Sequence, residues 1–125
     1  MQTIDTTTAL VDRYFAAWNT TDAARRTRLI SEAWTDDGTY LDPVMSGSGH
    51  SGIEAMIAGF QAQFPGLQFH RNAAIDAHND HLRFSWVLVA PDGPVIAAGT
   101  DVAVLSSDNR LRSVTGFFDQ APVLP

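Results

Sequence analysis

The spacing of apolar residues changes along the chain, from three or four residues in the first half to two in the second. Three segments share the longer spacing, which predicts amphipathic helices: residues 7–18, 23–33 and 52–63. Asp22 can cap the second helix, and Ser51, followed three residues later by Glu54, resembles a capping box for the third. Three arginines of the second helix are expected to point mostly outward: Arg25, Arg26 and Arg28.

From residue 67 onward apolar and polar residues alternate between turn-forming sequences, which predicts a meander of antiparallel strands. The long strands are predicted at residues 67–78, 81–90, 95–105 and 111–119. One face of the second of these carries Leu82, Phe84, Trp86 and Leu88. A turn and a shorter strand are predicted in TDDGTYLDP, between the second and third helices.

This order of elements predicts an α+β fold with three N-terminal helices packed on one face of a strongly curved, mostly antiparallel sheet. A curved sheet that is closed by helices forms a cone, and its mouth is a natural ligand site. The 125 residues are the usual length of one domain, so a single domain is expected over residues 1–125.

Composition and net charge argue against some classes of binding partner and of catalytic chemistry. The net charge is −6, and all eight cationic side chains are arginines. This balance argues against binding to nucleic acid or to an anionic membrane surface. The chain has no cysteine, which removes thiolate and disulfide chemistry. Neither a signal peptide nor an apolar run of membrane-spanning length is recognisable, so a cytoplasmic protein is expected.

Three polar residues stand in apolar surroundings. Asp42 follows the short strand and precedes Pro43, so it is either a solvated turn residue or a general base aimed into an apolar pocket. Asp101 is the only charged residue between Val95 and Leu105, and a buried carboxyl must pair or stay protonated. Tyr14 lies on the apolar stripe of the first helix, where its hydroxyl needs a partner or belongs simply to the core.

The order of these residues resembles the ketosteroid isomerases and their SnoaL-like relatives in the NTF2-like superfamily. The resemblance rests on three segments: ALVDRYFAAWNTTD, TDDGTYLDPVMSGSGHSGIEAM and AAGTDVAVL. It implies a cone-shaped fold, usually dimeric, with an apolar pocket and no cofactor. It also implies that Asp42 is a base that moves a proton between carbons, that Tyr14 is an oxyanion donor, and that Asp101 is a second donor kept neutral.

The function expected from this resemblance is a ketosteroid isomerase-like enzyme that moves a proton on a small hydrophobic carbonyl compound. Six residues are expected to line its pocket: Trp18, Trp34, Met56, Phe60, Trp86 and Phe118. Trp34 lies in SEAWTDDG, which is longer than the matching segment of the isomerases, and is expected to cover the mouth. A homodimer is expected as well.

Other functions remain open at this stage. His70 could pair with Asp101 as in SnoaL-type polyketide cyclases, and His50 could reach the pocket mouth. An epoxide-hydrolase-like site would use Asp101 with Arg83 or Arg112. A third reading, from another class, is a non-catalytic ligand-binding or dimerisation module. No spacing of ligands indicates a metal site.

Overall fold

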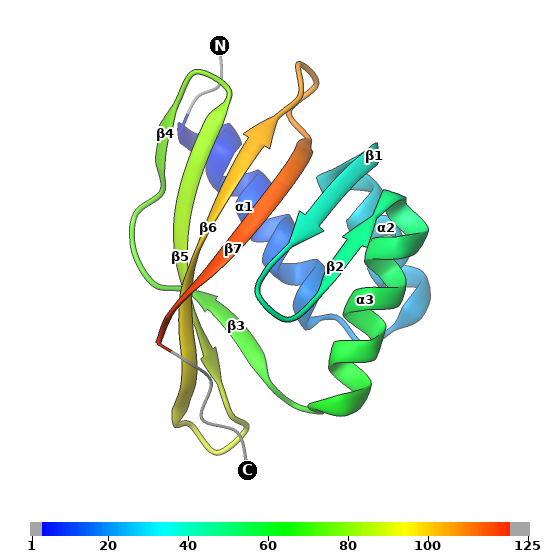
Figure 1. Cartoon of the computed structure of the whole chain (residues 1–125), viewed down its shortest axis with the longest axis vertical. Helices are drawn as coiled ribbons and strands as arrows, with labels where there is room; N and C mark the ends of the chain where they lie inside the picture. Colours follow the sequence, from blue (N-terminus) through cyan, green and yellow to red (C-terminus); the bar gives the residue numbers. More distant parts are fainter. Residues whose placement is uncertain (1–3, 121–125) are drawn as a thin grey trace.

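A computed structural model describes residues 4–120 of the chain, in which helices cover one side of a curved seven-stranded sheet (Figure 1). The helices are α1 (Ile4–Asn19), α2 (Ala23–Ala33) and α3 (Gly49–Gln63). The strands are β1 (Trp34–Leu41), β2 (Ser46–Ser48), β3 (Gln68–Arg71), β4 (Asp76–His78), β5 (His81–Val89), β6 (Val95–Leu105) and β7 (Leu111–Gln120). The α+β class is confirmed, although β1 and β2 precede the third helix, so the helices do not form an uninterrupted N-terminal block.

The sheet is mixed, with strand order β2-β1-β7-β6-β5-β3 and with β4 paired to β5. Neighbouring strands are antiparallel except β1 and β7, which run parallel. The register between β1 and β7 shifts between Trp34 and Thr39, so the predicted turn before the short strand is an irregularity inside β1. The parallel contact brings the end of β1, where Asp42 follows, beside the middle of β7.

The second helix has the predicted bounds, and the third begins earlier than predicted. Asp22 caps α2, because its side chain accepts a hydrogen bond from the backbone N of Arg25. The N-cap of α3 is Ser48, and Gly49 follows it with φ of 72°, a conformation that suits glycine. Ser51 therefore lies inside the helix, and the predicted capping box is wrong.

Arg26 corrects a second expectation about the helices. It was expected to point mostly outward, yet it is buried between α2 and α3. Its Nε donates to Glu54 Oε2 at 2.9 Å and its Nη1 donates to Gln61 Oε1 at 2.7 Å. The guanidinium is buried because α3 supplies a carboxylate and an amide for it, which the sequence of α2 alone does not reveal.

The long strands β5, β6 and β7 match their predicted ranges to within one residue, whereas the predicted strand 67–78 is split into β3 and β4. The alternation in β5 is confirmed, since its four apolar residues are all buried: Leu82, Phe84, Trp86 and Leu88. They pack with the apolar stripe of α1 in one core. Within residues 4–120 no helix is long and apolar enough to cross a membrane.

Candidate active site

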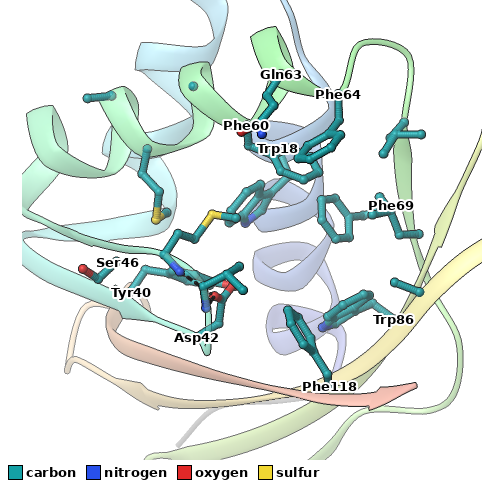
Figure 2. A pocket seen from close by; sticks show the side chains of 18 of the residues that line it. Trp18, Tyr40, Asp42, Ser46, Phe60, Gln63, Phe64, Phe69, Trp86 and Phe118 are labelled. Atoms are coloured by element: carbon teal, nitrogen blue, oxygen red, sulfur yellow. Dashed lines mark hydrogen bonds between the residues drawn. The ribbon is translucent and has the colours of Figure 1, made fainter. Parts of the chain in front are cut away.

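A cavity of about 860 Å³ lies between α3 and the inner face of the sheet (Figure 2). One wall is aromatic and comes from α1, α3 and the sheet: Trp18, Phe60, Phe69, Trp86 and Phe118. The facing surface of α3 adds small residues and one methionine: Gly52, Ala55, Gly59 and Met56. The polar lining residues are few: Tyr40, Asp42, Ser46 and Gln63. This is the composition of a site for an apolar ligand with a small number of polar contacts.

Most residues expected in the pocket from the sequence line this cavity, but Trp34 does not. Its side chain is fully buried in the core, with its ring centroid 5.2 Å from that of Tyr14. The reason is that Trp34 begins β1 instead of lying in a loop over the mouth. The longer segment that contains it therefore adds to the core and not to the lining of the cavity.

Asp42 lies directly after β1 and is half-buried in the cavity wall. Its Oδ1 accepts hydrogen bonds from the backbone N of Val44 at 2.8 Å and of Met45 at 2.9 Å. Its Oδ2 accepts one from the hydroxyl of Tyr40 at 2.7 Å. One oxygen thus closes the turn to β2, and the other keeps a lone pair for a further partner. The two readings of this residue from the sequence, turn residue and pocket carboxylate, both describe it.

Tyr40 was missed in the sequence, although it is the tyrosine that lines the cavity. Burial raises its pKa well above the ordinary value, and the charges of Asp101 and Asp42 raise it further. Its hydroxyl therefore stays protonated and available as a donor. A signal was present, because residues two apart on a strand share a face, which places Tyr40 beside Asp42.

Tyr14 and Asp101 form a second pair, behind the cavity wall. The Tyr14 hydroxyl donates to Asp101 Oδ2 at 2.6 Å, and Trp86 Nε1 donates to Asp101 Oδ1 at 3.0 Å. Both residues of the pair are 1% exposed, and neither lines the cavity. Burial raises the pKa of Asp101 to about 6, while the hydrogen bonds from Tyr14 and Trp86 oppose that rise. Burial also raises the pKa of Tyr14 well above its ordinary value.

The two pairs meet at Gly116 of β7. A Cβ on this glycine would lie 2.9 Å from Asp101 Oδ1, 3.2 Å from Asp42 Cβ and 3.2 Å from the Tyr40 hydroxyl. Gly116 is also the register partner of Asp101. The structure therefore brings Tyr14, Asp42 and Asp101 into one polar cluster around Gly116, in which Asp42 lines the cavity and the other two do not.

The other candidate residues lie elsewhere. His70 is exposed and pairs in register with Val87, on the opposite face of the sheet from the cavity. His70 therefore does not form the alternative pair with Asp101, because its neighbour Phe69 takes the inward position and Asp101 is bound to Tyr14 and Trp86. His50 does not line the cavity, and its Nε2 lies 2.9 Å from the Trp34 carbonyl oxygen.

The arginines considered for an epoxide-hydrolase-like site also point away from Asp101. Arg83 is exposed and forms an ion pair with Asp76 at 2.6 Å. Arg112 is exposed on β7. The part of the chain that the structure describes contains no group of three or more side chains placed to hold a metal ion.

Comparisons with known proteins agree on the fold. The family model of the SnoaL-like domain matches residues 11–114. A crystal structure from Agrobacterium tumefaciens strain C58, provisionally named an isomerase of the SnoaL-like family, is 41% identical with a TM-score of 0.88, over 92% of this chain and 98% of that chain. A comparison with curated proteins finds no match.

Two more distant structures show the fold alone. A provisionally named SnoaL-like polyketide cyclase from Jannaschia sp. CCS1 is 17% identical with a TM-score of 0.73, over 92% of this chain and 86% of that chain. An NTF2-like protein of unknown function from Exiguobacterium sp. 255-15 is 19% identical with a TM-score of 0.71, over 90% of this chain and 99% of that chain.

Proposed function

The chain belongs to the SnoaL-like family, and from that premise we propose that it is a cofactor-independent enzyme that moves a proton on a small hydrophobic carbonyl compound. The observation that carries this proposal is a carboxylate, Asp42, fixed in the wall of a predominantly aromatic cavity of about 860 Å³. The relative from A. tumefaciens, which carries the name of an isomerase, supports the same class of reaction.

In the proposed reaction Asp42 is the general base. Oδ2 takes a proton from the carbon next to the substrate carbonyl, the C–H electron pair forms a new carbon–carbon double bond, and the π pair of the carbonyl moves onto the oxygen. The same proton then returns to a different carbon of the enolate. Two backbone N–H groups hold Oδ1, so the carboxylate cannot turn away from the cavity. The apolar walls exclude water, which strengthens the electrostatic interactions in the site.

The charge that develops on the substrate oxygen needs hydrogen-bond donors. We propose that Tyr14 and Asp101 contribute to this stabilisation, as the family resemblance implies. They lie one residue behind the cavity wall, with Tyr14 bound to Asp101 and Asp101 bound to Trp86. Tyr14 and Asp101 do not line the cavity, so any effect that they have on the substrate oxygen is transmitted by residues that do. Among these, Tyr40 carries a hydroxyl group.

The test is an absorbance assay for conversion of a β,γ-unsaturated steroid ketone, or of the smaller 3-cyclohexenone, to the conjugated isomer. We expect wild-type turnover and a loss of about 10²–10⁴-fold in Asp42→Asn. Asp92→Asn, in an exposed turn, is the matched control and should keep full activity. Wild-type turnover that survives Asp42→Asn would contradict the proposal. Absence of turnover on both ketones, with retained binding, would favour the non-catalytic ligand-binding reading.

We also propose that the chain forms a homodimer through the outer face of the sheet. Phe117 is 55% exposed and Val102 is 36% exposed there, which is unusual for large apolar side chains on central strands. Light scattering on the wild type and on Phe117→Glu tests this. A monomer in both proteins would contradict it.

A further inference from the structure

We infer that Tyr40 is the residue that donates a hydrogen bond to the substrate oxygen, and that its hydroxyl switches from Asp42 to that oxygen as the proton is transferred. This inference rests on the proposed function and deepens it, since it assigns a catalytic role to a tyrosine that the family resemblance did not single out. Four features of the cluster carry it.

The first feature is access. Tyr40 lines the cavity, and its hydroxyl lies at the Asp42 carboxylate that a substrate must approach. Tyr14 does not line the cavity, and its hydroxyl proton is already given to Asp101 at 2.6 Å. A ligand in the cavity can therefore contact Tyr40, whereas Tyr14 is not part of the cavity surface.

The second feature is the choice of basic atom. Asp42 Oδ1 accepts two backbone hydrogen bonds, which occupy both of its lone pairs. Asp42 Oδ2 accepts one hydrogen bond, from Tyr40, and keeps one lone pair free. Oδ2 is thus the atom that takes the proton, and it is the same atom that holds the Tyr40 hydroxyl.

The third feature is the match in spacing. The Tyr40 hydroxyl oxygen and Asp42 Oδ2 are 2.7 Å apart. In a ketone the carbonyl oxygen and the neighbouring carbon are about 2.4 Å apart, from standard bond lengths. A substrate lying across the cavity wall can therefore place its oxygen at Tyr40 and its acidic carbon at Asp42 at the same time.

The fourth feature is the direction of charge movement. Before transfer the negative charge is on Asp42, and Tyr40 donates to it. When the C–H proton moves to Oδ2, the negative charge moves to the substrate oxygen and Asp42 becomes a neutral acid. A neutral acid accepts a hydrogen bond more weakly than a carboxylate does, so the Tyr40 O–H rotates to the oxyanion. Tyr40 thus donates one hydrogen bond at each stage, and return of the proton to the substrate gives its O–H back to Asp42.

The surroundings of Tyr40 keep its hydroxyl group protonated, so that it can donate a hydrogen bond. Burial raises the pKa of Tyr40 well above its ordinary value, and the charges of Asp101 and Asp42 raise it further. Tyr40 therefore holds its proton instead of giving it up to the enolate. Tyr14 and Asp101 act through Tyr40 and are positioning residues in this scheme.

The kinetic test compares two substitutions, each of which removes one tyrosine hydroxyl from the same cluster. We expect Tyr40→Phe to lower kcat by about 10²–10³-fold, the usual effect of removing one oxyanion donor, with KM nearly unchanged. Tyr14→Phe should cost less than about tenfold in kcat. A Tyr40→Phe variant with wild-type kcat, or a larger loss in Tyr14→Phe, would overturn the inference while leaving Asp42 as the base.

A second test does not depend on turnover. The Asp42→Asn variant resembles the protein after proton transfer, and ionised 2-naphthol resembles the enolate oxygen. The chain has two tyrosines, so labelling with tyrosine carrying ¹³C at Cζ gives two resonances, which either Tyr→Phe variant assigns. We expect the Tyr40 resonance to shift most on naphtholate binding, and Tyr40→Phe to weaken that binding at least about tenfold. A shift confined to Tyr14 would overturn the inference.

Discussion

Asp42 and Asp101 are the same residue type, each bound to one tyrosine, and they lie on either side of Gly116 in different surroundings. Asp42 lies in the cavity wall, takes two of its hydrogen bonds from the backbone, and has one lone pair free. Asp101 is 1% exposed and takes its hydrogen bonds from the side chains of Tyr14 and Trp86.

The difference between these carboxyl groups follows from what surrounds them. A carboxyl that reaches a cavity can exchange a proton with a ligand, whereas one that is buried among donors mainly affects stability and the charge of its neighbours. The Tyr40–Asp42 pair is made by residues two apart in sequence, at the end of β1. The Tyr14–Asp101 pair joins a helix to a strand across 87 positions of sequence. We therefore expect substitutions in the first pair to change activity and those in the second to change folding.

The largest expected effect on stability is that of Asp101→Leu. It leaves the Tyr14 O–H and the Trp86 N–H buried without an acceptor, at about 1–3 kcal/mol for each donor. The free energy of unfolding should fall by about 2–5 kcal/mol, measured by urea denaturation. Asp42→Leu should cost only about 1 kcal/mol, because the groups it leaves unpaired are closer to water. Equal losses in the two variants would erase the distinction between the pairs.

The next effect is the dependence of stability on pH. The pKa of Asp101 is raised from 3.8 to about 6, so the folded protein holds this proton more tightly than the unfolded chain does. Its contribution is complete below about pH 4 and is lost as the pH rises through about 6. Between about pH 4.5 and about pH 7.5 this group should lower the free energy of unfolding by about 2 kcal/mol.

Asp101→Asn lacks this titration and is the reference for that measurement. Urea denaturation of both proteins at the two pH values gives the difference in their free energies of unfolding. The free energy of unfolding of the wild type should fall relative to that of Asp101→Asn as the pH rises. A difference that stays constant, or grows in favour of the wild type, would contradict the assigned environment of Asp101.

Gly116→Ala tests the point where the pairs meet. The new methyl group would lie 2.9 Å from Asp101 Oδ1 and 3.2 Å from the Tyr40 hydroxyl, so one of them must move. We expect a loss of about 1–2 kcal/mol in stability, as for modest overpacking. Turnover should fall further, by about tenfold or more, because small displacements of catalytic groups are costly. Unchanged turnover together with reduced stability would place Gly116 outside the catalytic geometry.

Gly59→Ala is the matched substitution on the opposite wall and has the smallest expected effect. A Cβ at Gly59 would meet nothing within 4 Å, so the methyl group has room in the cavity. Because alanine is the better helix former, α3 should be stabilised by about 0.5–1 kcal/mol, seen as a higher Tm. Loss of stability in this variant would mean that the cavity is less open at α3 than the structure shows.

The sequence predicted the parts of this molecule that depend on local patterns. The range of α2, its cap at Asp22 and the range of β6 follow from periodicity and turn residues. Asp42 and Asp101 were singled out because each carboxyl interrupts an apolar segment. The resemblance implied that Asp42 and Asp101 belong to one site. The cluster that contains them is assembled by strand pairing between distant segments.

The features that could not be predicted depend on contacts between distant segments. Arg26 is buried because α3 offers Glu54 and Gln61, and Trp34 enters the core because β1 begins early and pairs with β7. Whether a polar residue faces the cavity or lies behind it is decided by one layer of side chains. The spacing of two residues places Tyr40 beside Asp42, but no local pattern shows which of the two tyrosines reaches the cavity, so Tyr40 was overlooked in favour of Tyr14.

The parallel pairing of β1 with β7 also constrains how the protein reaches its native state. Tyr40 and Asp42 belong to the first strand region, and Gly116, against which they rest, belongs to the seventh. Contacts between segments so far apart in sequence form late and slow the folding of a domain. During synthesis the helices and β1 leave the ribosome well before residues 111–120 do. The proposed catalytic cluster is therefore among the last parts of the molecule to assemble, and a chain that stalls before β7 would hold the cavity's helices without its active base in place.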